Sequence, residues 1–190
     1  IIRSLVAAFV GAVLFASVPA SATVVTFDDL SGGDFAPVPT IYAGIEWDPN
    51  WFQLASEVPV FPPHSPPVRI FTNNNNAGFD FVGGNKVFEG AWFSGFFSVF
   101  FILENDGVIV HTSDTLQLLG GSEALFLDSG YDGLVDRVVV SGVAGGYVMD
   151  DVTYGGNGGP GEVPEPAAPA LMLAGLLAVG ALRRRGKGKT

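Results

Sequence analysis

Two pairs of adjacent aspartates stand near opposite ends of the central part of the chain. Asp28 and Asp29 follow a β-branched run, and Asp150 and Asp151 lie within a second strand-forming run. The first and last strands of a β-sandwich often lie side by side, and alternation sends one Asp of each pair inward and the other outward. Carboxylates are ligands that Ca²⁺ prefers, so the pairs predict a calcium site. The competing interpretation is that these side chains cap strand ends, bond to turns or face water.

A third acidic stretch, residues 128–136, superficially resembles a calcium-binding loop. An acid is missing at its third position, where Gly130 stands, and Val139 occupies the twelfth position, which would need a bidentate Glu. The stretch is therefore interpreted as a turn-rich loop.

Aromatic side chains are the second kind of candidate. Sugar rings stack on exposed aromatic rings, while Asp, Asn and Glu bond the sugar hydroxyls. The candidates for ligand binding are Tyr42, Trp47, Trp51 and Trp92, with Tyr131 as a further aromatic. The competing interpretation is core packing, because aromatic rings bury large areas. Trp51, beside the turn Asp48-Pro49-Asn50, is expected to be the most exposed.

No catalytic residue is predicted. His64 stands in a proline-rich segment and His111 in an expected strand. The chain has no Gly-x-Ser-x-Gly elbow, no His-Glu-x-x-His pair and no phosphate-binding loop. Carboxylate pairs could serve a glycosidase, but some pairing arises by chance in so acidic a chain. We expect the protein not to be an enzyme.

Charge is distributed unevenly along the 190 residues. Of the 19 acidic residues, 17 fall between Asp28 and Asp151, where only 3 basic residues occur, so this part carries a net charge of −14. Nucleic-acid binding needs Lys and Arg to displace counterions, so this composition argues against it. The chain has no cysteine, and a hydrophobic core must therefore hold the fold without disulfides.

The elements that must position these candidates are short strands. Residues 23–154 show strand-forming runs separated by Gly, Pro, Asn and Asp turns, without sustained helical periodicity. They predict an all-β sandwich with about ten strands. The expected strands are 23–30, two within 41–54, 68–72, 79–82, 86–88, 92–103, 108–112, 115–119, 124–127, 137–141 and 147–154. Residues 58–67, with five prolines, are expected to form a surface loop with His64 at its tip.

The two ends of the chain differ from this central domain. Residues 1–22 are typical of a secretory signal peptide, with Arg3, an apolar run and Ala20-Ser21-Ala22 before the expected cleavage. Residues 155–161 form a Gly-rich linker. The tail, 162–190, has a Pro-rich motif at 163–166, an apolar run at 167–182 and a basic cluster at 183–189. The positive-inside bias would keep that basic cluster in the cytoplasm and the domain outside the inner membrane.

The tail resembles the C-terminal signal of PEP-CTERM proteins, which bacteria with an extracellular polysaccharide matrix export and process with an exosortase. The residues that carry the resemblance are Val163, Pro164, Glu165 and Pro166, followed by Arg183, Arg184 and Arg185 beyond the apolar run. This resemblance implies export, transient anchoring in the inner membrane, an exosortase-type partner, and release or attachment at the cell surface. The apolar run of 16 residues is marginal for spanning a bilayer, which fits a transient anchor.

The central domain resembles the exported jelly-roll domains related to carbohydrate-binding modules. The matching segments are 26–30, 42–47, 84–88 and 147–154. The resemblance implies a jelly-roll β-sandwich and adds weight to a structural calcium near Asp28 and Asp151. It leaves two functions open. A module that binds exopolysaccharide needs an exposed aromatic platform, whereas a purely structural matrix protein predicts that Trp47, Trp51 and Trp92 are all buried.

Overall fold

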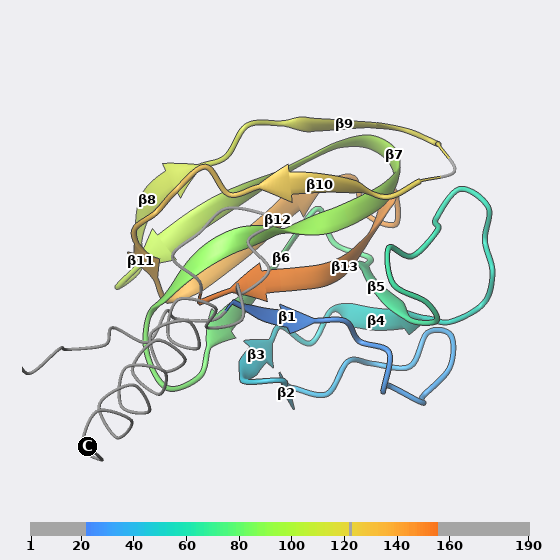
Figure 1. Cartoon of the computed structure of the whole chain (residues 1–190), viewed down its shortest axis with the longest axis horizontal. Coiled ribbons are helices and arrows are strands. Elements are labelled where there is room, and N and C mark those ends of the chain that lie inside the picture. The colour runs from blue at the N-terminus through green and yellow to red at the C-terminus, as the bar shows by residue number, and fades with distance from the viewer. Residues whose placement is uncertain (1–21, 122, 156–190) are drawn as a thin grey trace, which may run out of the picture.

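The computed structural model describes residues 22–121 and 123–155 (Figure 1). The predicted signal peptide, nearly all of the predicted linker and the sorting tail lie outside the described residues. Within the described part, all regular structure is β, which confirms the all-β class. No helix in that part is long and apolar enough to cross a membrane.

Thirteen strands occur in the described part of the chain. They are β1 Thr23–Val25, β2 Ile41–Tyr42, β3 Ile45–Trp47, β4 Trp51–Leu54, β5 Arg69–Thr72, β6 Asn76–Phe81, β7 Lys86–Asn105, β8 Val108–Thr112, β9 Leu116–Leu119, β10 Leu125–Asp128, β11 Leu134–Val135, β12 Arg137–Gly142 and β13 Tyr147–Tyr154. The strands expected at 108–112 and 147–154 are confirmed with the same bounds, and most others within a few residues.

One strand, β7, belongs to both layers of the fold. Its first half pairs with β13 and β10, and its second half pairs with β12, β8 and β9. It bends at Gly95, whose φ of 133° suits glycine, and a Cβ there would lie 2.5 Å from the carbonyl oxygen of Gly146. The two strands expected at 86–88 and 92–103 are therefore one, because Gly90 and Gly95 bend the strand rather than end it.

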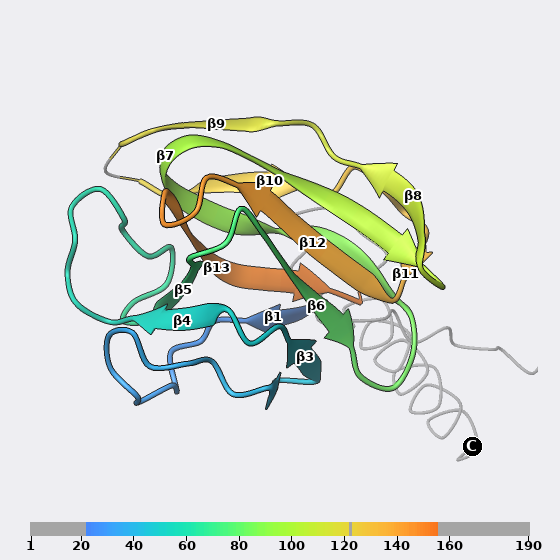
Figure 2. The ribbon, with the colours of Figure 1, turned by 180° about the vertical axis from the view of Figure 1, so that it is seen from behind.

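The two layers enclose the main core. The first layer has the order β4–β5–β13–β7–β10, with β1 on β13, and faces the viewer in Figure 1. The second has the order β2–β3–β6–β12–β7 and lies in front in Figure 2. The first and last strands pair antiparallel, with Thr23 opposite Tyr154, which confirms the side-by-side placement expected from the sequence. The main core and a smaller apolar cluster lie wholly between Val25 and Tyr154, so this stretch contains what it needs to fold as a domain.

The proline-rich loop between β4 and β5 lies across the outer face of the first layer. A single buried cation holds it: the Arg69 guanidinium donates to the carbonyl oxygens of Phe61 (2.9 Å), Leu54 (3.0 Å) and Ser56 (2.7 Å). The expected loop is confirmed, and His64 is exposed, but it does not extend away from the domain. It is folded back onto the sheet, because its backbone is bound there.

Replacing Arg69 with Lys should therefore destabilise the domain. An ammonium group cannot reproduce the planar fork that serves three carbonyls, and hydrogen bonds to charged groups are worth about 1.5–3 kcal/mol each. We expect the free energy of unfolding of Arg69→Lys to fall by about 2–4 kcal/mol in urea titrations followed by tryptophan fluorescence.

Arg137→Lys is the matched control. Arg137 is only half-buried and pairs with Asp48 at 2.8 Å and with Asp80 at 2.5 Å. Exposed ion pairs contribute about 0–1 kcal/mol, so its loss should be smaller. Equal losses in the two variants would contradict the role assigned to Arg69.

Candidate functional site

Two of the predicted ligand-binding residues, Trp47 and Trp51, are core residues. Trp47 packs against Phe27 at 5.4 Å and Phe79 at 4.9 Å between ring centroids. The Trp51 ring is fully buried and its Nε1 donates to the carbonyl oxygen of Gly78 at 3.0 Å. The expectation that Trp51 is exposed is wrong. Its indole nitrogen finds a backbone acceptor inside the protein, so burial leaves no polar group unpaired.

Tyr42 and Trp92 remain partly accessible. Tyr42 lies on the short edge strand β2, where its ring stacks on Phe27 at 5.8 Å and its hydroxyl donates to Asp29. Partial burial, and then the bond to the Asp29 carboxylate, raise the pKa of the Tyr42 hydroxyl well above its usual range. Tyr42 is thus engaged both by its ring, which stacks on Phe27, and by its hydroxyl, which donates to Asp29.

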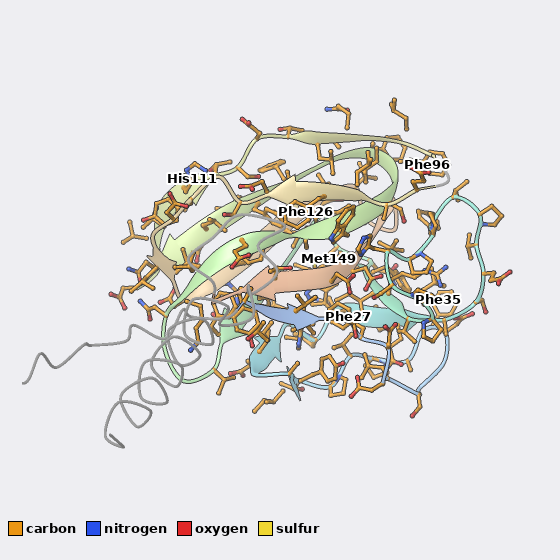
Figure 3. All side chains as sticks on the ribbon, in the orientation of Figure 1. Phe27, Phe35, Phe96, His111, Phe126 and Met149 are labelled. Carbon is orange, nitrogen blue, oxygen red and sulfur yellow. The ribbon has the colours of Figure 1, made fainter. Side chains whose placement is uncertain are left out.

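Trp92 stands in a cluster of rings on the outer face of the first layer. The His64 ring stacks on it at 3.6 Å with an interplanar angle of 9°, and Phe126 meets it edge-on at 5.5 Å. Phe126 on β10 and Asp150 on β13 are the cross-strand neighbours of Trp92, so they share its row of the sheet (Figure 3 labels Phe126). We call His64, Trp92 and Phe126 the Trp92 cluster.

The Phe126 ring is held by a glycine opposite it. Gly90 has a φ of 151°, and a Cβ at this position would come within 2.7 Å of the Phe126 ring and 2.2 Å of the Leu127 carbonyl oxygen. Because glycine has no Cβ, the Phe126 ring can approach the β7 backbone closely at Gly90. The position of Phe126 beside Trp92 therefore depends on the absence of a side chain at Gly90.

His64 is fixed by the two aspartates of β13. The backbone N–H groups of His64 and Ser65 donate to Asp150 Oδ2 at 2.8 and 2.9 Å. Asp151 contacts His64 Nδ1 at 2.5 Å and accepts a hydrogen bond from the Ser65 hydroxyl at 2.7 Å. Because that hydroxyl donates to the carboxylate rather than to the imidazole, the group is not a nucleophile–base pair. Its evident role is to position the His64 ring on Trp92.

Both aspartates point to the same side, against the expected alternation. The pairing of β13 with β7 shifts register between Asp150 and Thr153, and Asp151 has a φ of 44°. Such a bulge re-aims a side chain, which is why Asp151 joins Asp150 on the outer face instead of entering the core.

Asp150 is an unusual carboxyl group because it is buried. Burial first, and then the negative charge of Asp151, raise its pKa to about 7, although three backbone N–H donors, from His64, Ser65 and Asp151, act in the opposite direction. Asp150 is therefore expected to exchange a proton near neutral pH.

The other aspartate pair has separate partners. Asp28 accepts a hydrogen bond from the Val68 N–H at 3.3 Å, and Asp29 accepts the Tyr42 hydroxyl. Over residues 22–121 and 123–155, no group of three or more His, Asp or Glu side chains is placed to hold a metal ion. Calcium binding by Asp28, Asp29, Asp150 and Asp151 thus stays a prediction from the sequence.

Residues 129–133 form a loop, as interpreted from the sequence, but Asp128 ends β10, and Leu134 and Val135 form β11, which pairs with β7. The Asp128 carboxylate accepts the Gly130 N–H at 2.7 Å, and Asp136 accepts the Asp106 N–H at 2.8 Å. Tyr131 stacks on His111 at 5.4 Å, so that ring is also engaged by a neighbour. Asp128 thus binds the backbone of its own stretch, and Asp136 binds the backbone of the β7–β8 hairpin.

A groove of about 320 Å³ lies at the bend of β7, and no member of the Trp92 cluster lines it. Residues of β7, β9, β10 and the segment between β9 and β10 surround it, and β9 and β10 pair with different halves of β7. Its lining is Ser94, Gly95, Gln117, Leu118, Leu119, Gly121, Glu123 and Leu125. The sequence reasoning missed this groove, since it depends on the bend of β7 and not on a motif.

Two members of the Trp92 cluster were also missed. His64 looked like a loop residue, and no local pattern shows that Asp150 and Asp151 bind its segment. Phe126 could have been found, because in the run Leu125-Phe126-Leu127-Asp128 alternation turns it away from the buried Leu127. What could not be found is which ring of another strand it meets.

No protein-family model and no curated protein matches the chain. Among solved structures it is similar to family 29 carbohydrate-binding modules, the class of module that the sequence resembles. A mutant of CBM29-2 complexed with mannohexaose has 15% identity and a TM-score of 0.46, covering 78% of this chain and 100% of that chain. Another mutant, complexed with cellulohexaose, has 15% identity and a TM-score of 0.46 over 78% and 99%. A further family 29 module has 15% identity and a TM-score of 0.42 over 75% and 92%. Likenesses at this level carry no argument about a ligand.

The raised pKa of Asp150 predicts a pH dependence of stability. In the folded protein this carboxyl binds a proton up to about pH 7, whereas its ordinary pKa is 3.8. Between these values the folded state holds the extra proton, so the free energy of unfolding should fall as pH rises, by at most about 1.4 kcal/mol per pH unit. Asp150→Asn should flatten this slope between pH 5 and 8, measured by urea unfolding.

Asp128→Asn is the control, because Asp128 is exposed and bonds only its own turn. It should retain the wild-type slope. A slope that is the same in wild type and Asp150→Asn would show that Asp150 does not titrate in this range.

Proposed function

We propose that this protein is a non-catalytic, exported surface or matrix protein that binds a neutral glycan through the Trp92 cluster. One observation carries the proposal: the stacked His64 and Trp92 rings, 3.6 Å apart, stand with Phe126 on the outer face of a strand layer. They come from three different segments and are held there by Asp150, Asp151 and the space at Gly90. These contacts fix the position of rings that lie outside the core, as expected of a preformed binding surface.

The chemistry of the cluster suits a sugar. The exposed His64 ring and the partly accessible rings of Trp92 and Phe126 offer apolar surface for the C–H face of a pyranose. With His64 Nδ1 engaged by Asp151, its Nε2 is the ring atom that can bond a hydroxyl. Asp128, exposed at the end of β10, adds a carboxylate acceptor in the next row of the sheet. A few polar groups around an apolar surface are typical of small-molecule sites.

The charge of the domain favours an uncharged ligand. Seventeen acidic and three basic residues lie between Asp28 and Asp151. A polyanionic polysaccharide would be repelled by this net charge of −14, whereas a neutral exopolysaccharide would not. Mannohexaose and cellulohexaose, present in two of the similar structures, are uncharged and serve as probes.

The destination of the protein is proposed from its tail. The motif Val163-Pro164-Glu165-Pro166, the apolar run 167–182 and Arg183–Arg185 support sorting as a PEP-CTERM protein by an exosortase-type enzyme. The tail would hold the protein briefly in the inner membrane before release or attachment at the cell surface. A jelly-roll architecture for residues 23–154 belongs to the same proposal and is supported by the two layers that share β7.

A purely structural matrix protein is the second candidate. The burial of Trp47 and Trp51 favours it, because that function needs no exposed aromatic platform. The two candidates differ at Trp92, which is only partly buried.

Glycan binding should change the fluorescence of Trp92 and should be lost with it. Because Trp47 and Trp51 are buried, a spectral shift on adding a hexasaccharide should arise from Trp92 and be absent in Trp92→Phe. In affinity electrophoresis through neutral polysaccharide, Trp92→Ala should weaken binding about 10-fold or more, the loss expected for an aromatic contact worth ~1.4 kcal/mol.

Phe35→Ala is the matched control, since Phe35 is an exposed aromatic residue whose ring packs against Phe71, and Figure 3 shows it apart from Phe126 of the Trp92 cluster. It should bind like the wild type, and near-UV circular dichroism should show that all variants fold. If folded wild-type protein binds no neutral glycan across an array, the structural function replaces this one.

Sorting should depend on the Pro-rich motif. In a bacterium that carries an exosortase, the wild-type protein should lose its basic tail, detected as a lower mass and release from the membrane fraction. Glu165→Ala should stay at full mass in the membrane, whereas Glu162→Ala, just outside the motif, should be processed normally. Equal processing of both variants would argue against this sorting route.

A further inference from the structure

One end of the domain carries apolar side chains on adjacent turns. Phe96 and Phe97 at the bend of β7 are 40% and 57% exposed, Leu119 at the end of β9 is 88% exposed, and Val143 between β12 and β13 is 45% exposed. We call these four residues the apolar tip. Phe96 on β7 is the cross-strand neighbour of Leu119 on β9. The turn before β13 lies against Phe97, because a Cβ added to Gly146 would lie 3.0 Å from the Phe97 ring. Figure 3 shows Phe96 at this end, opposite His111.

The backbone holds both phenylalanines outward. In a regular strand, consecutive side chains point to opposite faces, so one of the two would enter the core. Here Phe97 has a φ of 68°, a left-handed conformation that is strained for a bulky residue. Hydrogen bonds from Phe96 N to Gly146 O (2.7 Å) and from Gly120 N to Gly95 O (2.8 Å) tie the bend to the neighbouring turns. Strain of this kind persists where the exposed position of the side chain serves a purpose.

The four side chains of the tip are uncharged, and few acids lie near them: Glu123 lines the groove together with Leu119, and Glu57 precedes the segment 58–62. The segments that meet there contain no charged residue, although the domain holds 17 acids and 3 bases. They are 58–62, 72–76, 94–99, 116–121 and 142–147. Contacts join these segments. The ring centroids of Phe61 and Phe96 lie 6.1 Å apart, and the Gly145 N–H donates to the Thr72 carbonyl oxygen at 2.8 Å. At the opposite end, Glu104, Asp106 and Asp136 surround the β7–β8 hairpin.

From these features we propose that the apolar tip inserts into the interface of an electrically neutral lipid bilayer. Partition into a bilayer scales with the apolar area buried, and none of the four side chains of the tip carries a charge that would have to be dehydrated. The amides of Asn73 and Asn74, exposed on an adjoining turn, fit the level of the headgroups.

A protein partner fits the same surface less well. Stable protein interfaces bury about 800 Å² on each side in a complementary shape. Four side chains on separate turns do not supply such an area, whereas a bilayer accepts individual side chains. The inference is independent of the glycan proposal, because no member of the Trp92 cluster belongs to the tip.

Vesicle binding by residues 22–155 tests the proposal, since this stretch contains the described core and lacks the apolar run 167–182. A Phe97→Trp reporter should shift to shorter wavelength on adding phosphatidylcholine vesicles and be quenched by brominated acyl chains. The shift should be insensitive to salt, because no charged group takes part. No shift and no quenching would overturn the proposal.

A matched pair of variants sharpens the test. Phe97→Asn removes the ring while suiting the left-handed backbone, so vesicle partition should fall about 10-fold without loss of thermal stability. Val108→Asn places the same polar residue at an exposed apolar position of the charged end, where Val108 is 63% exposed. This variant should partition like the wild type.

Equal losses in the two variants would contradict insertion through the tip. A concentration-dependent dimer that Phe97→Asn abolishes, with no vesicle binding by the wild type, would show that a second copy covers this surface instead. Hexasaccharide binding should be unchanged in Phe97→Asn, so failure of the glycan proposal and failure of this one are distinguishable.

Discussion

The passage of β7 from one layer to the other is the constraint on which the rest of the structure depends. The chain has no cysteine, so no disulfide joins the layers. The 20-residue strand β7 instead pairs with strands of both layers. The passage requires Gly95, because a Cβ there would collide with the carbonyl of Gly146. Gly95 also lines the groove, together with residues of β9 and Leu125 of β10. The Trp92 cluster and the apolar tip are set by where along β7 this bend occurs.

The proline-rich loop is held in place by two buried charged residues, Arg69 and Asp150. Its five prolines lack N–H donors, so the segment 58–67 cannot join a sheet by ladder hydrogen bonds. Instead, its Phe61 carbonyl accepts from Arg69, its Pro62 carbonyl accepts from the Ser94 hydroxyl, and two of its remaining N–H groups donate to Asp150. A cation under one part of the loop and a carboxylate under another thus replace the sheet pairing that proline forbids, and they bring His64 to Trp92.

What could be predicted from the sequence follows from how local each feature is. The class of fold, the β7–β8 hairpin at Asn105-Asp106-Gly107 and the strand 147–154 depend on residue types within a few positions. The exposure of Trp51 was predicted wrongly because burial depended on an acceptor, Gly78, 27 residues away. The contacts of His64 join residues 86 and 87 positions apart, and the bulge that re-aims Asp151 has no sequence signature. Long-range pairs of this kind make up the candidate site.

The two proposed surfaces lie only a few residues apart on one strand, yet face different directions. Trp92 precedes the bend, where side chains of β7 still alternate and its ring joins the outer face of the first layer. Phe96 and Phe97 follow Gly95, where the left-handed φ of Phe97 breaks the alternation and turns both rings to the end of the domain. A bilayer at the tip would therefore leave the Trp92 cluster on the side of the domain, open to a polymer lying along the membrane. The same bend that closes the core separates a face suited to sugar from an end suited to lipid.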